Sequence, residues 1–167
     1  HKALPDDAFF PFSLSTNASE FHQDNDKALH WMKVAANSPN AAPWYSAAVA
    51  GLMVKEGDRR ASIRYLKEQL EQVEDPTLRS FSEERLRILI HEELEEQIEE
   101  RRRRFIEVVG RNIQSVSELE LDFPDPYHVM GGEWILADDG RVRSSIVEEK
   151  VLKKTKKRER ELLMRAH

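Results

Sequence analysis

The sequence predicts a mainly α-helical fold, in which two antiparallel helix pairs and a long helix precede a small C-terminal β-hairpin and a basic helical tail. Three observations carry this prediction. Apolar residues recur at three- and four-residue spacing over residues 26–109, which is the period of an amphipathic helix. The pattern then changes to an alternation of apolar and polar residues around Asp139 and Gly140, a strong signal for a hairpin. Only six glycines in the whole chain also fit helices better than sheets.

Composition limits the protein to a few classes. Its 167 residues suit one domain. No apolar run approaches the length of about 18 residues that spans a bilayer. The absence of cysteine excludes disulfides, thiolate metal sites and cysteine nucleophiles. A net charge of −5 disfavours nucleic acid as the partner of the whole chain. The chain begins with His1 instead of Met, so we expect a trimmed or processed N-terminus, upstream of which an anchor or signal peptide could stand.

Residues 1–25 predict an extended arm that contains phenylalanines. Prolines, serines and asparagines interrupt any clean helical period in this segment, which nevertheless carries four phenylalanines. Such side chains pack either on the protein's own surface or on a partner, and the first alternative is the more common one. The candidate partner contacts in the arm are Phe9, Phe10 and Phe12.

Four helices are expected after the arm, separated by clusters of proline, glycine, asparagine and aspartate. Asp58 is placed to cap the third helix, and Pro76 is placed in the first turn of the fourth. A long helix through "IHEELEEQIEERRRRFIEVV" then completes an α-helical domain of residues 26–109. Aromatic residues of this domain are the next candidate partner contacts, namely Trp31, Trp44 and Tyr45.

The two helix pairs have features in common. An alanine opens the first helix of each pair at Ala28 and Ala61, an aromatic residue follows at Trp31 and Tyr65, and a proline opens each second helix. The offset between the pairs is close to the period of about 34 residues that is typical of tetratricopeptide repeats. The pairs therefore resemble that repeat family. The resemblance implies stacked helix pairs, and because two units are fewer than such an array needs, another element should cover the open end.

The segment "HEELEEQIEERRRRF" allows three interpretations. A zinc motif would need a second histidine four residues after the first, where the sequence has a glutamate. The run Arg101–Arg104 could form a nucleic-acid patch. However, Glu99 and Glu100 stand four residues before Arg103 and Arg104, which is the favourable order for ion pairs within a helix. We therefore favour a solvated, salt-bridged helix.

Residues 110–146 predict a short helix through "SELEL", a break at "DFPDP" and the hairpin. The hairpin part fits the pattern D-P-x-G-G-x-W-x-L-x-x-D-G-x-V-x-S, with "YHVM" inserted between the Asp-Pro pair and the glycine pair. This module and the helices before it resemble bacterial envelope proteins with tetratricopeptide-like helices, and its last part is similar to the distal end of major pseudopilins. The resemblance implies a membrane-associated setting in the cell envelope, with the periplasmic side favoured. The matching residues are Asp125, Pro126, Gly131, Gly132, Trp134, Leu136, Asp139, Gly140, Val142 and Ser144.

The hairpin module offers little site chemistry. Its aspartates supply carboxylates without the twelve-residue loop of a calcium site. Ser144 or Ser145 with His128 lacks the elbow and the orienting acid of a nucleophilic site. We predict no catalytic residue, no metal and no cofactor. The hairpin is interpreted as a cap that docks Trp134, Ile135 and Leu136 on the exposed end of the helix pairs.

Residues 147–167 form a basic tail of helix-forming composition, with eight Lys or Arg against four Asp or Glu. The sequence thus predicts a non-catalytic protein–protein interaction scaffold, an accessory or assembly subunit of a bacterial membrane-associated complex. Binding of anionic lipid or nucleic acid through the tail and Arg101–Arg104 is the alternative, and a merely solvated terminal helix is a further one. The candidate partner contacts in the tail are Lys153, Lys154, Lys156, Lys157 and Arg158.

Overall fold

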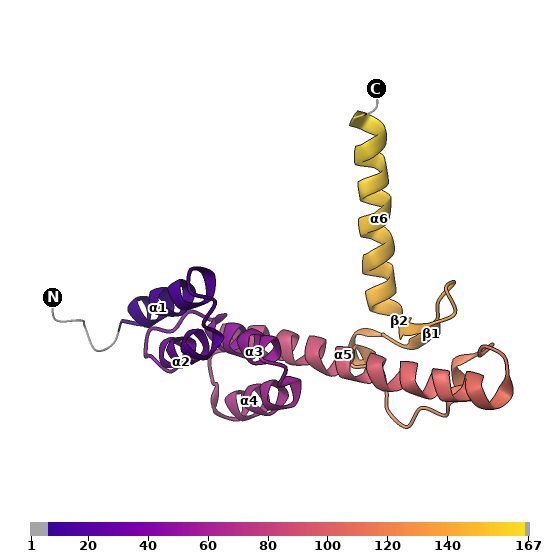
Figure 1. The fold of residues 1–167 in the computed structure, drawn as a ribbon, viewed down its shortest axis with the longest axis horizontal. Coiled ribbons are helices and arrows are strands. Elements are labelled where there is room, and N and C mark those ends of the chain that lie inside the picture. The colour runs from indigo at the N-terminus through magenta and orange to yellow at the C-terminus, as the bar shows by residue number, and fades with distance from the viewer. Residues whose placement is uncertain (1–6, 166–167) are drawn as a thin grey trace. The chain divides into compact units, whose positions relative to one another are not determined.

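The computed structural model describes the backbone of residues 7–165 and the side chains of residues 7–158 (Figure 1). The fold is mainly α with a two-stranded antiparallel hairpin near the C-terminus, which confirms the predicted fold class. The described residues form two compact units, one up to Leu89 and one from Ile90, so the boundary falls inside a helix. The elements are α1 Phe9–Glu20, α2 Asn25–Ala36, α3 Tyr45–Lys55, α4 Arg59–Gln72, α5 Pro76–Val109, η1 Val116–Leu119, η2 His128–Met130, β1 Trp134–Leu136, β2 Val142–Ser144 and α6 Ser145–Arg165.

Helix α1 lies where the sequence predicted an extended arm, and that prediction is wrong for residues 9–20. The buried face of α1 consists of Pro11, Ser15 and Ala18, which follow a helical spacing but are not large apolar residues. Pro11 falls in the first turn, where a missing N–H has no consequence. The Ser15 hydroxyl donates a hydrogen bond to the Ala28 carbonyl oxygen at 2.7 Å, which ties α1 to α2. Residues 1–6 of the predicted arm lie outside the described residues.

Small residues allow the helices of the first unit to approach closely. Ala28, Ala35 and Ala50 are each 0% exposed, and α1, α2, α3 and α4 pack in chain order. The Ser62 hydroxyl donates to the Ala50 carbonyl oxygen at 2.9 Å, which repeats between α4 and α3 the contact that Ser15 makes between α1 and α2. Serine and alanine therefore hold both pairs of neighbouring helices together.

Helix α5 unites two elements that the sequence analysis treated separately, the fourth helix and the long helix. It begins as predicted at Pro76, and the Asp75 carboxylate caps it by accepting hydrogen bonds from the backbone N–H groups of Thr77 and Leu78 at 2.8 and 2.9 Å. Its first half brings the fully buried Leu89 against Leu66 and Ala50. Because no glycine or proline interrupts residues 77–109, nothing in the sequence stops the helix before Gly110.

The predicted hairpin is present in the second unit. Trp134 pairs with Ser144 and Leu136 with Val142, so these four side chains share one face. The strands are joined by the five residues 137–141, among which Gly140 has a φ of 75° that is easily adopted only by glycine.

The hairpin covers the second half of α5. Trp134 and Leu136 pack in a cluster with the buried side chains of Ile98, Ile113 and Val142. The contacts of the cap therefore differ from the predicted ones, which placed it on the end of the helix pairs. The physical reason is that α5 continues past Leu89 and presents its own apolar stripe, which the hairpin and η1 cover.

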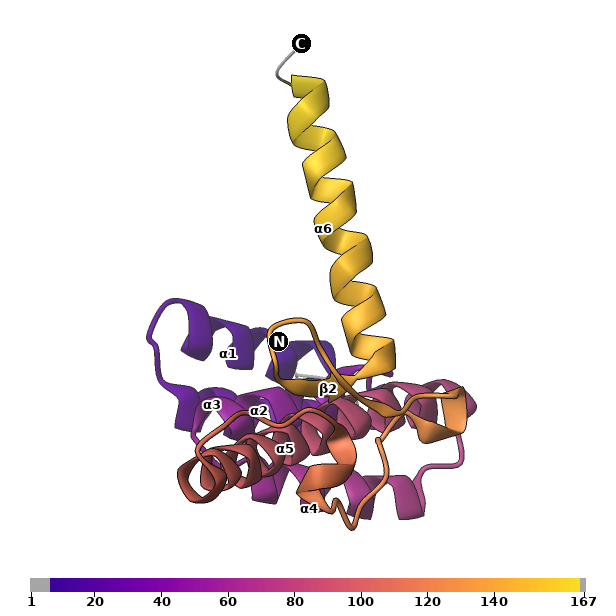
Figure 2. The same cartoon turned by 90° about the vertical axis from the view of Figure 1, so that its right-hand side faces the viewer.

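The predicted basic tail is helical and begins at Ser145, directly after β2. Within the second unit α6 contacts β2 near its start and then leaves the hairpin (Figures 1 and 2). Every residue from Glu149 to Arg158 is exposed, including Val151 and Leu152 at 46% and 50%. The helix thus presents all its faces over this stretch.

Candidate functional site

A groove of about 460 Å³ lies in the first unit. Side chains of α1, α3 and α5 line it, and Met32 of α2 contributes from the neighbouring helix. Ala48, Leu52 and Val54 of α3 make most of the apolar wall. A cavity of this size is typical of sites for small organic molecules.

Two cations and one carboxylate of the groove remain without an ionic partner among the described residues. They are the half-buried Arg85 of α5 and the exposed Lys55 and Glu20, at the C-terminal ends of α3 and α1. The Arg85 guanidinium lies beside Gly51, because a Cβ built on that glycine would stand 3.9 Å from Arg85 Nη2. The groove therefore combines an apolar wall with a net positive charge.

The aromatic candidates of the first unit separate into buried and exposed residues. Phe12 stacks on Tyr45 at 5.2 Å between ring centroids and meets Trp44 edge-on at 5.3 Å. Tyr45 is only 6% exposed, so it serves the core and cannot contact a partner directly. Phe9, Phe10 and Trp44 remain available, with exposed fractions of 66%, 54% and 41%. Trp31 is half-buried beside His30.

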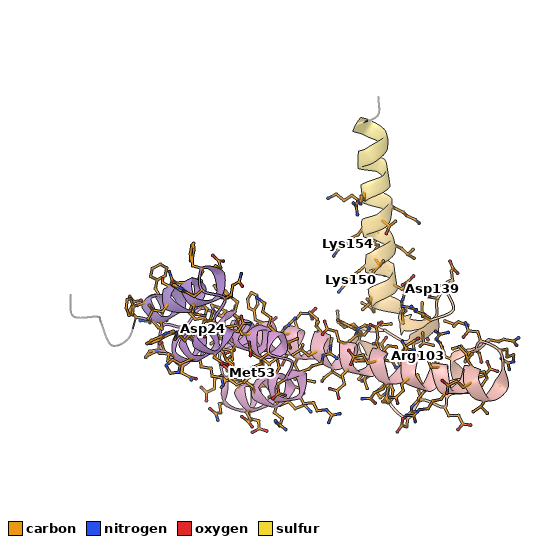
Figure 3. All side chains as sticks on the ribbon, in the orientation of Figure 1. Asp24, Met53, Arg103, Asp139, Lys150 and Lys154 are labelled. Carbon is orange, nitrogen blue, oxygen red and sulfur yellow. The ribbon has the colours of Figure 1, made fainter. Side chains whose placement is uncertain are left out.

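The basic candidates on α6 all lie on the exposed stretch. The segment from Glu148 to Arg158 contains six lysines and arginines and only two glutamates. Lys150 and Lys154 stand one turn apart (Figure 3), and Lys153 pairs with Glu149 at 2.6 Å. The ammonium group of Lys150 lies 5.5 Å from the centre of the Tyr127 ring, a cation–π contact near the start of the helix. Most of this positive charge therefore faces solvent.

The arginines at positions 101–104 are occupied by partners within the chain. Arg102 donates two hydrogen bonds to the Glu99 carboxylate, both 2.9 Å, which lowers the pKa of Glu99. The predicted pairs of Arg103 with Glu99 and of Arg104 with Glu100 are confirmed. Arg101 reaches Asp122 at 2.6 Å and lowers the pKa of that carboxyl group. Arg101 and Arg102 thus link α5 to the segment that follows it, whereas Arg103 and Arg104 pair within the helix and keep side chains that are 72% exposed.

A buried imidazole occupies the core beneath the hairpin. His91 is 5% exposed, stacks on Trp134 at 5.7 Å between ring centroids and meets Tyr127 edge-on at 5.6 Å. Glycine is required next to this cluster, since a Cβ on Gly132 would stand 2.9 Å from the Tyr127 carbonyl oxygen. Gly132 therefore serves the close packing of the loop, whereas Gly131 has open space around it and a φ of 81° that favours glycine.

The positions considered for metal or nucleophilic chemistry are not assembled into a site. Among residues 7–158 no group of three or more His, Asp or Glu side chains could hold a metal ion. Ser144 is 0% exposed, and Nδ1 of His128 lies 2.9 Å from the Asp125 carbonyl oxygen. No helix within the described part of the chain is long and apolar enough to cross a membrane.

A scan of protein-family models, a search of curated proteins and a search of solved structures each returned no match to this chain. The resemblance to tetratricopeptide repeats and to envelope proteins therefore stays a prediction from the sequence.

Sequence reasoning did not predict the residues that line the groove. Its residues come from four helices, and only the fold brings Ser19, Lys55 and Arg85 together. One signal was present, because Gly51 stands in the middle of a segment that otherwise has a strong helical pattern.

Proposed function

We propose that this chain is a non-catalytic interaction protein that docks on an acidic surface of a partner protein through α6. The observation that carries the proposal is the exposure of every residue from Glu149 to Arg158. Helices in proteins owe most of their stability to the packing of one face, and the described residues supply little packing for this stretch. A partner surface would supply it, and the positive charge of α6 favours an acidic one.

The setting we propose is a membrane-associated complex of the bacterial cell envelope, on its periplasmic side, in which this chain is an accessory or assembly subunit. The resemblance of the helix pairs and the hairpin module to envelope proteins supports this setting. Phe9, Phe10 and Trp44 offer further contacts, because large exposed apolar side chains are typical of interaction surfaces, and the rings of Phe9 and Trp44 both contact the ring of Phe12.

Anionic lipid and nucleic acid are the alternative acidic surfaces. Nucleic acid is the weaker of the two, because the arginines at positions 101–104 are already paired and the chain is acidic overall. A lipid surface would attract the lysines of α6 at roughly 1 kcal/mol per residue. Val151 and Leu152 add apolar contact that either a lipid surface or a protein groove could cover.

The test is an affinity purification of the tagged full chain from native membranes, with two charge-reversed variants. The first variant, Lys154→Glu with Lys156→Glu, changes α6. The second, Arg64→Glu with Lys67→Glu, makes the same charge change at exposed positions of α4 and is the matched control. A photo-crosslinking residue at Thr155, which is also exposed, then identifies the surface that α6 touches.

The proposal expects a defined set of proteins that the wild type and the α4 variant retain and the α6 variant loses. The cross-links from position 155 should fall on acidic segments of one of these proteins. Retention of the same proteins by the α6 variant would contradict the proposal. Binding to vesicles that contain phosphatidylglycerol, lost with the α6 variant while no protein is lost, would replace it with the lipid alternative.

A further inference from the structure

We infer that the groove of the first unit binds a free long-chain carboxylate, with the Arg85 guanidinium on the carboxylate and the apolar wall of α2 and α3 against the acyl chain. The inference is independent of the partner proposed for α6, because all residues of the groove lie in the unit up to Leu89.

The positive charge of Arg85 has no anionic partner among the described residues, so an anion from outside the chain would stabilise it. Its acidic neighbours on α5 are engaged elsewhere, since Glu84 pairs with Arg87 at 2.6 Å and Glu83 pairs with Arg79 at 3.7 Å. Among the described residues no hydrogen bond or ion pair involves Arg85 itself, although its side chain is half-buried. A half-buried guanidinium gains most from a carboxylate that can accept two parallel hydrogen bonds.

Two further charges of the groove lining affect the binding of an anion. The Lys55 ammonium group adds a second cation to the lining, whereas the Glu20 carboxylate opposes an incoming anion. The lining therefore carries one net positive charge, and removal of the Glu20 charge should strengthen anion binding.

Gly51 is the observation that distinguishes a binding site from an accidental groove. A glycine in the middle of a helix is less stable than alanine by roughly 0.5–1 kcal/mol. Here a Cβ would meet only Arg85 Nη2, at 3.9 Å, which is an ordinary contact, and the φ of Gly51 is not positive. Packing and backbone conformation therefore do not require glycine at position 51. A Cβ would instead project into the groove beside the guanidinium.

The lining favours an acyl chain over a peptide. A peptide brings N–H and C=O groups that need partners when they are buried. The hydroxyls of Ser15 and Thr16 already donate to the backbone carbonyls of Ala28 and Phe12. The side chains of Met32, Leu52 and Val54 cannot form hydrogen bonds with a peptide, but they can cover methylene groups.

The experiment is a calorimetric titration of the full chain with dodecanoate below its micelle concentration. Dodecanol and dodecyltrimethylammonium have the same chain with a neutral and a cationic headgroup, so they are the matched ligands. Chemical shifts of the Met32, Leu52 and Val54 methyl groups locate the bound chain, and far-UV circular dichroism checks that the protein stays folded.

We expect dodecanoate to bind more tightly than either matched ligand and to shift the three methyl signals. Arg85→Gln should weaken binding about tenfold, which is the effect of losing one charge-assisted contact. Arg64→Gln, at an exposed arginine of α4 outside the groove, should leave the affinity unchanged. Glu20→Gln should tighten binding. Gly51→Ala should raise the Tm of the protein while it lowers the affinity for dodecanoate, a combination that a purely structural role of Gly51 does not produce.

Several results would overturn the inference. These are equal affinity for dodecanol and dodecanoate, an unchanged affinity in Arg85→Gln, and shifts confined to methyl groups outside the groove. Tighter binding by a peptide with an acidic C-terminus that displaces dodecanoate would also reject the acyl chain as the ligand. None of these outcomes depends on whether α6 captures a partner protein.

Discussion

The two units bury their residues in different ways. The first unit packs small side chains, such as Ala28, Ala50 and Ser62, so that helix backbones approach each other closely. The second unit packs aromatic rings around His91 and fastens its loops with charged hydrogen bonds. The first design is sensitive to added volume and the second to lost volume and to pH. The comparison thus predicts opposite responses to substitution in the two units.

The largest effect is expected where the second unit depends on one large side chain. Trp134→Ala removes the ring that stacks on His91 and meets Phe123 at 6.4 Å, so it should reduce the free energy of unfolding by about 3 kcal/mol. Urea unfolding followed by circular dichroism measures this loss. Trp44→Ala is the matched control. Because Trp44 is 41% exposed, this substitution should reduce the free energy of unfolding by less than half as much. Equal losses would remove the distinction between the half-buried ring of Trp134 and the exposed ring of Trp44.

Added volume should be the main threat to the first unit. Ala28→Leu places three more carbon atoms at a position that is 0% exposed, where α1 and α2 are in contact. We therefore expect the free energy of unfolding to fall by about 2 kcal/mol. The same urea measurement applies. Val34→Leu on the same helix is the control, since Val34 is 41% exposed and has room for one more methylene. A stable Ala28→Leu protein would show that the helices can separate without cost.

The hydroxyl hydrogen bonds of the first unit should contribute less to the free energy of unfolding than its close helix packing does. Ser62→Ala removes the donor to the Ala50 carbonyl oxygen and should reduce the free energy of unfolding by about 1 kcal/mol. Ser82→Ala is a strict control, because the Ser82 hydroxyl is also buried but has no hydrogen-bond partner among the described residues. We expect that substitution to be neutral or slightly stabilising. Equal losses for the two variants would mean that the Ser62 hydrogen bond is not what matters.

Local signals in the sequence predicted most of this architecture. Asp58 caps α4, Pro76 opens α5, and the Asp139-Gly140 pair lies in the hairpin loop, because each depends on neighbours within a few residues. Helix α1 was missed because its buried positions are occupied by proline, serine and alanine, which do not stand out as an apolar stripe. The buried face of α1 can be recognised only once α2 is known to pack against it.

The groove could not be predicted for a different reason. Its charge comes from Arg85 and Lys55, which are 30 positions apart and unremarkable within their own helices. Sequence periodicity predicts which face of a helix is buried, but not which residues of different helices line the same cavity. Gly51 marked a departure from helix propensity, and such departures are expected at functional positions.

The smallest effect on stability at neutral pH is expected from the ion pairs and charged hydrogen bonds of the second unit. The Glu118 carboxylate accepts hydrogen bonds from Arg111 at 2.6 Å and from the Gln114 backbone N–H at 2.6 Å. These contacts, led by the one with Arg111, lower the pKa of Glu118 to about 2 from its usual value of 4.5. A lowered folded-state pKa means that the stabilisation is complete above about pH 4.5 and is lost as the pH falls towards 2.

Glu118→Gln should therefore flatten the dependence of Tm on pH over this acid range while it changes Tm little at neutral pH, where the amide can still accept the backbone hydrogen bonds. Thermal unfolding at a series of pH values down to about pH 2 measures the difference from the wild type. Glu107→Gln removes an exposed carboxylate of α5 that has no ion pair among the described residues, and should leave the slope unaltered. If both variants follow the wild-type curve, the acid response of the second unit does not come from the Arg111–Glu118 pair, and the proposed contrast in pH sensitivity between the units loses its main support.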